Sequence, residues 1–372
     1  MDSSQRTGRA ILAIVALPPP THGQALVTQA ILAKLSTTNA RLKIIDTSPG
    51  SLKKGFEYHR KRIAAIVLRA LPAILMGTND VLYITAEAGL GIYYNFLIVL
   101  SARAARLKIV LHHHTSSYAK VYRRRFDLLS RLAGKHAVHV ALDETMARDL
   151  KARYSSIERV VVAHNASYVG RPAITDRGER NLTCGFMSNL TREKGLDLFL
   201  GFLRKAKHSG LNLQAVVAGP AVSREIEEMI ADAQSEFGSS LTILGPVSGP
   251  SKENFFRSID VFLMPTRHKA EAQPLVILEA LSYGVPVATS QQGYCSELVG
   301  GAGVSAGIPE FESVAISFVR RCYDDTEYLG KMRHEALERF EYLRAEADRQ
   351  LNDLMSVLCS ASATSFKAQV AH

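Results

Sequence analysis

The stretch LTCGFMSNLTREKGLDLFLGFLRKAK, residues 182–207, decides the fold class of this 372-residue chain. Its first seven residues form a short apolar run typical of a buried strand, and residues 195–207 have the apolar spacing of an amphipathic helix. A second strand-like run, LQAVVAG, follows at 213–219. A strand, a helix and a strand in this order predict two parallel strands joined by a crossover helix.

The same alternation extends in both directions along the chain. Further strand-like runs in the second half are 241–247, 261–266 and 286–290. Those in the first half are 10–17, 42–47, 80–85, 108–113, 137–143 and 159–164. Apolar runs that alternate with helices are typical of parallel sheets covered on both faces. The chain is therefore assigned to the α/β class, and its length favours two domains.

The segment YVGRPAITDRGERN interrupts this pattern with glycine, proline and charge and has no periodicity, as expected of a linker. After about Phe311 strand candidates end, so C-terminal helices are expected. We predict an N-terminal Rossmann-like domain at 1–170, a linker at 171–181, a C-terminal Rossmann-like domain at 182–345, and a helix and tail at 346–372. Ligands bind outside the carboxyl ends of parallel strands, so two facing sheets would define an interdomain cleft.

Charge is distributed unevenly around a net value of +10. Residues 1–175 hold 25 Lys and Arg against 10 Asp and Glu, and residues 176–372 hold 20 against 25. The two parts therefore carry +15 and −5. This asymmetry predicts that the N-terminal half meets an anionic partner, which could be a membrane surface, a phosphorylated acceptor or nucleic acid.

The strongest local signal is HKAEAQPLVILEALSYGVPV, which places Glu271 and Glu279 eight positions apart around Pro274. Pro274 suits the start of a helix, where the N–H groups of Leu275 and Val276 would be free to bind an anion. Glu271 is then expected before the helix and Glu279 in its second turn. Two carboxylates around an anion site suit a nucleotide-sugar, which has hydroxyls at both ends and phosphates between them. The alternative is two ordinary charges, one solvated and one favoured by the helix dipole.

A second signal is SNLTREKGLDLFL, in which Lys194 immediately precedes Gly195 and a new helix. A lysine at this position is a mobile point charge that can meet a diphosphate leaving group. Taken alone, the motif also fits a lysine that is merely solvated.

A third signal places His22 and Gly23 directly after the first strand-like run, at the start of a helix. Gly23 would let a bound phosphate or sugar approach the backbone closely. The segment lacks G-x-G-x-x-G, which excludes the usual nicotinamide dinucleotide fingerprint.

Three consecutive histidines, His112, His113 and His114, follow the strand-like run KIVL. Alternate side chains of a strand point to opposite faces, so the three cannot readily bind one metal ion. His113 or His114, at the strand end, is expected to contact the donor sugar or the acceptor. The alternative is a histidine packed in the core.

Other chemistries lack their motifs. The four cysteines are scattered, with no C-x-x-C pair or zinc-ligand spacing, which predicts a reduced, cytoplasmic protein without a metal site. No D-x-D triplet, P-loop or G-x-S-x-G motif is present, so neither metal nor serine-nucleophile chemistry is supported.

Together these segments resemble the retaining glycosyltransferases of the GT-B fold that carry an E-x7-E motif (glycosyltransferase family 4-like), including bacterial capsule and exopolysaccharide enzymes. The resemblance runs through SNLTREKG, VVAG, DVFLMPT, the two glutamates and GVPVATSQQGYCSEL, in the family's order. It implies a hexosyltransferase that uses no cofactor and takes a UDP- or GDP-linked sugar as co-substrate. Retention would follow from front-face attack, with the departing phosphate helping to deprotonate the acceptor hydroxyl.

The resemblance also implies roles for individual residues. Lys194 would neutralise the donor diphosphate, Glu271 would contact the hydroxyls of the transferred sugar, and Glu279 would bind the ribose. Many members have an arginine where this chain has Asn189, which removes one charge from the phosphate site. The amides of Leu275 and Val276 become correspondingly more important. The family usually has glycines where Ala272 and Gln273 stand.

The basic N-terminal half fits a saccharide or lipid-linked acceptor at the inner face of a membrane. In KVYRRRFDLLSRLAGK, Leu128, Leu129 and Leu132 would share a helical face beside Arg123–Arg125, as in a helix that lies on anionic lipid. The alternative is an ordinary amphipathic helix packed on the core. We therefore expect a cytoplasmic protein that can attach peripherally to the membrane.

Two other function classes compete with this interpretation. A nucleotide-sugar epimerase or sugar phosphorylase would share the two-domain architecture, and an epimerase would alter the donor without an acceptor. A non-enzymatic nucleic-acid-binding protein would explain the basic half but would leave Lys194, Glu271 and the second domain without a purpose. No nucleic-acid partner is therefore expected.

Overall fold

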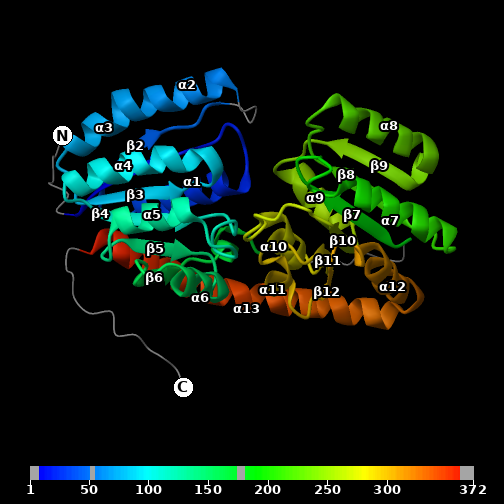
Figure 1. Ribbon diagram of the computed structural model, residues 1–372. Helices are drawn as coiled ribbons and strands as arrows, with labels where there is room; N and C mark the ends of the chain where they lie inside the picture. The colour runs from blue at the N-terminus through cyan, green and yellow to red at the C-terminus, as the bar shows by residue number, and fades with distance from the viewer. Residues whose placement is uncertain (1–7, 51–54, 174–180, 361–372) are drawn as a thin grey trace, which may run out of the picture. The chain divides into compact units, whose positions relative to one another are not determined.

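The computed structural model describes residues 8–50, 55–173 and 181–360 and contains two compact units (Figure 1). The first unit comprises the described residues of Met1–His114, Tyr118–His164 and Arg349–His372. The second comprises the described residues of Thr115–Ser117 and Asn165–Asp348. Most of the predicted linker, 171–181, and the tail after residue 360 lie outside the described residues. The predicted domain boundaries therefore stay predictions.

The first unit contains a six-stranded parallel sheet with the order β2-β1-β3-β4-β5-β6. Its strands are β1 (Ala10–Val15), β2 (Arg41–Asp46), β3 (Val81–Ala86), β4 (Lys108–His113), β5 (Val138–Ala141) and β6 (Arg159–Val162). All residues of the adjacent strands β1 and β3 are buried, whereas the edge strand β2 is largely exposed. Continuous apolar runs are what a parallel sheet covered on both faces requires of its inner strands.

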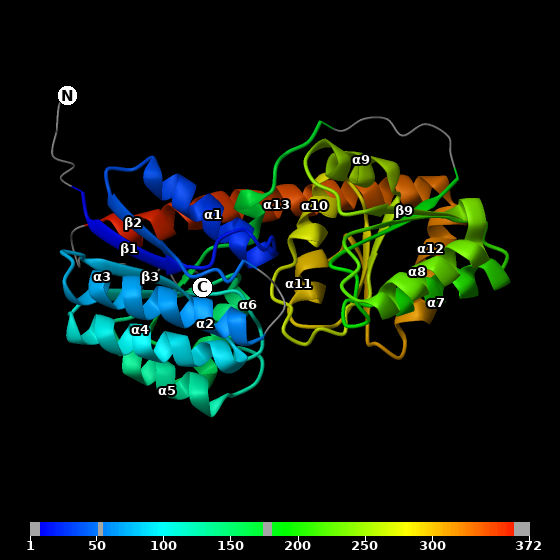
Figure 2. The same cartoon turned by 90° about the horizontal axis from the view of Figure 1, so that it is seen from above.

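Helices cover both faces of this sheet. They are α1 (Gly23–Ser36), α2 (Phe56–Ala65), α3 (Leu71–Leu75), α4 (Ile92–Ala104), α5 (Arg124–Ala133) and α6 (Glu144–Arg153), with the short π-helix η1 (Ile66–Ala70) and the 3-10 turn η2 (Gly89–Gly91). The 3-10 turn η3 (Asn165–Tyr168) follows β6 in the chain and belongs to the second unit. Figure 2 shows α1 and the C-terminal part of α13 (Thr326–Cys359) on one face, and α2, α3, α4 and α5 on the other.

The second unit contains a parallel sheet with the order β12-β11-β10-β7-β8-β9. Its strands are β7 (Thr183–Met187), β8 (Gln214–Ala218), β9 (Leu241–Gly245), β10 (Val261–Met264), β11 (Val287–Ser290) and β12 (Gly303–Ala306). Counted from β7, the order is 3-2-1-4-5-6, that of a doubly wound nucleotide-binding sheet. The winding reverses between β7 and β10, which lie next to each other.

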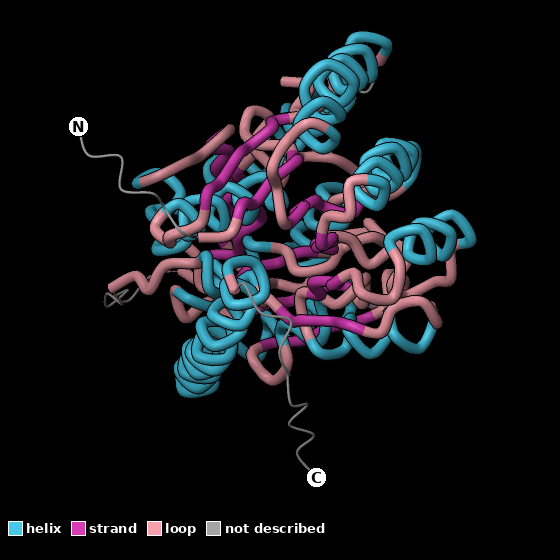
Figure 3. The backbone as a smooth tube through the Cα atoms, turned by 90° about the vertical axis from the view of Figure 1, so that its left-hand side faces the viewer, coloured by secondary structure: helices cyan, strands magenta, loops and turns pink. Residues whose placement is uncertain are grey.

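A hydrophobic core lies on each face of the second sheet, between strands and helices. Figure 3 colours the strands magenta and the helices cyan. The helices of this unit are α7 (Leu196–His208), α8 (Arg224–Phe237), α9 (Pro250–Ser258), α10 (Leu275–Ser282), α11 (Cys295–Val299), α12 (Phe311–Asp324) and the N-terminal part of α13, with the turn η4 (Gly238–Ser240). One core contains Phe199 of α7 and Phe318 of α12. The other contains Phe256 of α9, Leu278 of α10 and Phe340 of α13.

The alternation predicted from the sequence is confirmed in both units. Every predicted run coincides with a strand, and the chain is helical from residue 311 to 359 except at Asp325, the boundary between α12 and α13. One strand, β12, was missed, because GVSA is short and small and sits at the sheet edge, where burial is incomplete. It therefore has no apolar run to detect.

Helix α5 corrects the predicted membrane patch. Leu129 is fully buried and faces the core with Phe126 and Ala133, whereas Leu128 is 59% exposed. The prediction that Leu128, Leu129 and Leu132 present one apolar face outward is therefore wrong, because that face is needed for packing on the sheet. Within the described part of the chain, no helix has both the length and the apolar character needed to span a bilayer.

Candidate functional site

The carboxyl ends of β7 and β10 form the centre of the candidate site. Loop 188–195 follows β7 and loop 265–274 follows β10. Because the winding of the sheet reverses between these two strands, this edge is the position where doubly wound sheets bind ligands. Both motifs singled out in the sequence of this half lie in these loops.

Gly195 determines how closely the two loops approach. Its φ is +89°, and a Cβ atom added there would lie 2.0 Å from the carbonyl oxygen of Pro265. Only glycine fits such a contact. The N–H of the preceding Lys194 donates to Thr191 Oγ1 at 2.9 Å, and α7 begins at Leu196. The glycine therefore lets the loop turn so that Lys194 stands beside the end of β10.

An arginine holds the two loops together from the other side. The guanidinium of Arg267 donates to both carboxylate oxygens of Asp197, at 2.6 and 3.0 Å. Its backbone N–H donates to the carbonyl of Glu193 at 2.7 Å. A bidentate pair restricts both distance and angle. The loop that carries Lys194 is thereby fixed relative to the loop that carries Glu271.

Lys194 and Glu271 form an ion pair between Nζ and Oε1. The side chain of Glu271 is 9% exposed and that of Lys194 is 29% exposed. Thr266 Oγ1 also lies 3.4 Å from the same carboxylate oxygen. Gly293 packs so closely on the backbone here that an added Cβ would meet the Glu271 carbonyl oxygen at 1.6 Å. Glu271 is therefore held rigidly, while the ammonium can reach solvent and an incoming anion.

The far side of the Glu271 loop is fastened by two contacts that sequence reasoning missed. Asn165 of η3 donates its backbone N–H to Gln273 Oε1 at 2.9 Å and its side-chain amide to the Gln273 carbonyl at 3.1 Å. The N–H of Ser116 donates to the Ala270 carbonyl at 3.2 Å. These partners are more than 100 residues away in sequence, so no local pattern could reveal them. The side chain and the carbonyl of Gln273 thereby anchor this loop to η3.

Helix α10 begins at this loop, as predicted. Leu275 and Val276 are its first two residues. Pro274 stands at the N-cap position and makes no capping hydrogen bond with its side chain. The first N–H groups of a helix have no acceptor within the helix and favour an anion. The predicted positions of Glu271, before the helix, and Glu279, in its second turn, are both confirmed.

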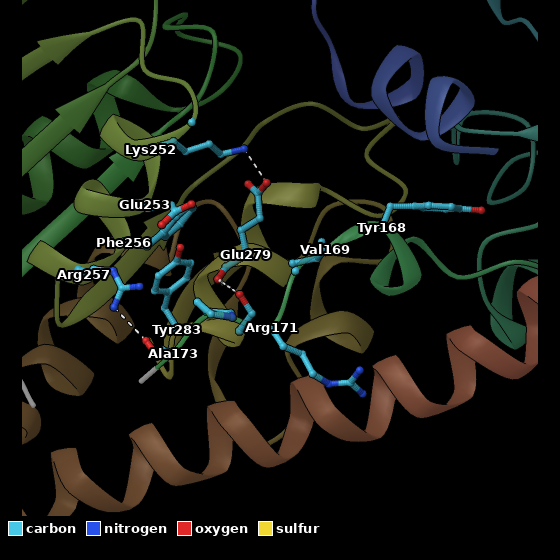
Figure 4. Close-up of a pocket in the computed structure, with 14 residues that line it drawn as sticks. Tyr168, Val169, Arg171, Ala173, Lys252, Glu253, Phe256, Arg257, Glu279 and Tyr283 are labelled. Atoms are coloured by element: carbon cyan, nitrogen blue, oxygen red, sulfur yellow. Dashed lines mark hydrogen bonds and ion pairs between the residues drawn. The ribbon is translucent and has the colours of Figure 1, made fainter. Parts of the chain in front are cut away.

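Glu279 lies at a pocket of about 430 Å³ lined by residues 168–173 and by side chains of α9 and α10 (Figure 4). Lys252 of α9 donates from Nζ to Glu279 Oε1 at 2.5 Å. The other carboxylate oxygen, Oε2, is buried and has no hydrogen-bond partner among the described residues. A buried acceptor of this kind is costly unless a donor reaches it, and a ligand hydroxyl is such a donor. Lys252 had no signal in the sequence that linked it to Glu279.

Asn189 lies in the loop after β7 and is partly buried. The hydroxyl of Ser188 donates to its carbonyl at 3.0 Å. The asparagine brings no charge to this end of the sheet. It lies in the same loop as Lys194.

The predicted residues of the first unit lie at the carboxyl edge of its own sheet. Gly23 is the first residue of α1, and the ring of His22 caps this helix by accepting from the Ala25 N–H at 3.3 Å. Burial lowers the pKa of His22, and the nearby Glu87 partly counteracts this effect. A neutral imidazole that already accepts a backbone hydrogen bond is suited to holding the helix start in place.

The three consecutive histidines have different environments. His113 is fully buried, and its two ring nitrogens bond to Tyr118 at 3.0 Å and to His139 at 2.9 Å. His112 is also fully buried and bonds to Tyr83. His114 is partly exposed, and its Nε2 has no partner among the described residues. His113 is therefore placed in the core, and His114 is the better placed of the two to meet a ligand.

Burial keeps these histidines neutral. It lowers the pKa of His114 to about 3, with a smaller contribution from His22, and it lowers the pKa of His113 well below its usual range. The rings of His112 and His114 lie 4.1 Å apart on one side of β4, and His113 stacks on His139 on the other. The predicted alternation of the three side chains is confirmed. Among the described residues, no group of three His, Cys, Asp or Glu side chains is arranged to hold a metal ion.

Residues 181–320, from β7 into α12, match the family model of the glycosyl transferases group 1. This match covers the greater part of the second unit, which is therefore similar in sequence to the group 1 glycosyltransferases. The predicted family resemblance and enzyme class are thereby confirmed. A sequence comparison of the chain with curated proteins finds no match.

Several solved structures share the fold of this chain. HepE (Alr3699) of Anabaena, in complex with UDP-glucose, has a TM-score of 0.69 at 15% identity, covering 94% of this chain and 100% of HepE. Sucrose-phosphate synthase from Thermosynechococcus elongatus has a TM-score of 0.68 at 13% identity, covering 94% of this chain and 100% of the synthase. The apo form of the lipopolysaccharide outer core galactosyltransferase WaaB has a TM-score of 0.64 at 14% identity, covering 93% of this chain and 99% of WaaB. The predicted GT-B fold is confirmed.

Proposed function

We propose that this protein is a glycosyltransferase that moves a hexose from a UDP- or GDP-linked donor to a saccharide or lipid-linked acceptor, with retention of anomeric configuration, in polysaccharide or glycoconjugate biosynthesis. The donor class is supported by the match to the glycosyl transferases group 1. It is also supported by HepE, which shares the fold and whose structures contain UDP-glucose or UDP. UDP is therefore the nucleotide to test first.

The Lys194–Glu271 pair carries the proposal. In the free enzyme each charge neutralises the other at the end of the sheet. When the donor arrives, we expect the Lys194 ammonium to turn to the diphosphate, together with the N–H groups of Leu275 and Val276. Glu271 would then accept hydrogen bonds from the hydroxyls of the transferred sugar. A preorganised cation and helix N–H groups stabilise the charge that develops on a leaving diphosphate.

The other end of the donor would lie at Glu279. Its unpartnered oxygen Oε2 suits a ribose hydroxyl, and the pocket beside it suits the nucleoside. Asn189 would contact the donor without adding charge. This division of labour uses two carboxylates for two sets of hydroxyls and places the phosphates between them.

The reaction itself would need little from the protein beyond positioning. The bond between the anomeric carbon and the diphosphate oxygen breaks, and the acceptor oxygen bonds to that carbon on the same face. The acceptor proton passes to the departing diphosphate. Gly23 and His114, at the carboxyl edge of the first sheet, are proposed for the acceptor side, and His113 is proposed to support this edge from the core through its hydrogen bonds to Tyr118 and His139. We further propose a cytoplasmic protein that attaches peripherally to the inner face of a membrane.

Replacing Lys194 tests this proposal. UDP- and GDP-hexoses are first screened by thermal shift, because a ligand that binds the native state raises its apparent stability. With the donor found, Lys194→Ala should release nucleotide diphosphate at least about 100-fold more slowly than wild type, the scale of losing one preorganised charge. Its melting temperature should stay close to that of wild type.

The matched control is Lys205→Ala, which removes an exposed lysine of α7 that pairs with Glu312. This variant should keep wild-type turnover. Near-normal turnover by Lys194→Ala, in a protein whose fold and donor binding are intact, would refute the proposed role.

A further inference from the structure

The helices on one face of the first sheet expose an unusual amount of apolar surface. Of the 19 large hydrophobic side chains that are exposed among the described residues, 13 lie on or beside α2–η1–α3, α4 and α5, so exposure is concentrated on this face. We call them the apolar helix face. They are Phe56, Ile63, Val67, Leu68, Leu75, Met76, Leu90, Tyr93, Leu97, Leu100, Val121, Tyr122 and Leu128.

These side chains lie on or beside adjacent helices of one face. Helix α3 packs against α4, and α4 packs against α5, so the three helices lie side by side on the same face of the sheet (Figure 2). Met76 is 84% exposed, Phe56 80% and Leu68 73%. Single exposed apolar residues are ordinary, but a contiguous group indicates an interaction surface.

Positive charge surrounds the apolar helix face. Its exposed basic residues are Arg60, Lys61, Arg69, Arg103, Arg106, Arg123, Arg124, Arg125, Arg131 and Lys135. The segments 56–76, 90–106 and 121–135 contain only two acidic residues, Glu57 and Asp127. Glu57 pairs with Arg60 and Asp127 with Arg131, and Glu158, outside these segments, pairs with Lys135. The cations of this face still outnumber these three acidic residues.

We infer that the apolar helix face docks on an anionic lipid bilayer. Aliphatic side chains beside arginines and lysines are what a surface needs in order to enter the headgroup region and bind anionic lipids. Tyr93 and Tyr122, which suit the boundary between lipid and water, lie among them, and the Arg125 guanidinium sits over the Tyr93 ring at 5.4 Å. The helices lie on the membrane and do not cross it.

The same charges argue against other partners. A second copy of the chain would bring like charges together around the apolar residues, which opposes a symmetric dimer through this face. Nucleic acid would satisfy the cations, but it offers no apolar surface to Leu68, Leu75 or Met76. Lipid satisfies both requirements at once.

This surface replaces the one predicted from α5 alone. The apolar residues that protrude most belong to α2–η1–α3, and α5 contributes mainly arginines. The inference rests on the proposed function only for its purpose, which is to hold the enzyme where a lipid-linked acceptor is found.

Vesicle flotation of the full-length protein tests the inference. We expect binding to vesicles of phosphatidylcholine with phosphatidylglycerol, weaker binding in high salt, and little binding to phosphatidylcholine alone. The double variant Leu68→Glu/Met76→Glu should bind anionic vesicles at least about tenfold more weakly. The variant Lys61→Gln/Arg69→Gln should lose about tenfold on anionic vesicles.

Val222→Glu is the matched control, because Val222 is 47% exposed but lies in the second unit. It should float like wild type. UDP binding, measured by calorimetry without lipid, should be unchanged in every variant, so failure of the membrane surface can be distinguished from failure of the donor site. The inference would be overturned if the protein bound neutral and anionic vesicles equally and the Leu68→Glu/Met76→Glu variant bound them as tightly as wild type. A lipid-free dimer that this double variant dissociates would also overturn it.

Discussion

The carboxyl edges of the two sheets hold contrasting groups of side chains. In the second unit, Lys194 and Lys252 are paired with Glu271 and Glu279, and each ammonium remains partly exposed. In the first unit, the corresponding edge holds His113 beside the buried His139, and burial keeps both neutral. The second edge therefore presents two lysine–glutamate pairs, whereas the end of β4 in the first unit presents hydrogen-bonded neutral rings, with the Arg62–Glu87 ion pair after the neighbouring β3.

This difference indicates a division of labour. A partly exposed ion pair can exchange its partner for a ligand of the same charge, whereas a buried neutral cluster fixes the shape of a surface. The second edge is thus suited to a diphosphate. The first is suited to positioning an acceptor that has no strong charge of its own.

The largest predicted effect comes from breaking the close approach of the two loops in the second unit. In Gly195→Ala the new Cβ would meet the Pro265 carbonyl oxygen at 2.0 Å with φ at +89°. We expect a loss of more than about 3 kcal/mol in the free energy of unfolding, because a backbone clash adds to left-handed strain. Urea denaturation measures it.

Gly210→Ala separates the clash from the strain. Gly210 has φ of +77°, and a Cβ there would meet nothing within 4 Å. It should cost only about 1–2 kcal/mol, as left-handed alanine does. Equal losses at the two positions would show that the contact with Pro265 is unimportant for the loop.

A smaller effect is expected from the second ion pair. Lys252→Ala would leave the Glu279 carboxylate without its fixed partner and let it rotate. We expect the KM for the nucleotide-sugar to rise about tenfold with kcat nearly unchanged, because ribose contacts bind ground state and transition state alike. Steady-state kinetics distinguishes this from the Lys194→Ala pattern, in which kcat falls.

Lys61→Ala is the control for removing an ammonium, because Lys61 is exposed on α2 in the first unit. It should leave both kinetic constants unchanged with a soluble acceptor. If Lys252→Ala lowered kcat as much as Lys194→Ala does, the two ion pairs would not have separate roles.

Most strands and helices of the fold could be predicted from the sequence alone. Buried parallel strands such as β1 and β7 are short apolar runs, and such runs can be recognised one at a time. Edge strands are harder, and β12 was missed because burial does not select apolar residues there. The position of Leu129 was also wrong, because an apolar helix face looks the same in sequence whether it packs on a sheet or meets a membrane.

The candidate site could be predicted where a motif is local. Glu271, Pro274 and Glu279 lie within nine residues, and helix geometry fixes their relation. The contacts of Gln273 with Asn165 and of Glu279 with Lys252 join distant segments, so they depend on how the sheet is wound. The separation of His113 from His114 by burial likewise depends on packing that no single strand reveals.

The smallest predicted effect tests the first edge. Burial lowers the pKa of His139 to about 3. Below about pH 6.5, His139 is therefore protonated in the unfolded protein but stays neutral in the folded protein. Its contribution to stability is full above pH 6.5 and is lost as pH falls towards 3. Wild type should therefore lose about 0.7 kcal/mol more than His139→Gln between pH 7 and pH 6, as the linkage for one histidine requires. Urea denaturation at both pH values measures this, with the exposed His136→Gln as control. An equal loss in wild type and His139→Gln would mean that the ring can take up a proton inside the folded protein, and the neutral edge would then be no different in kind from the charged one.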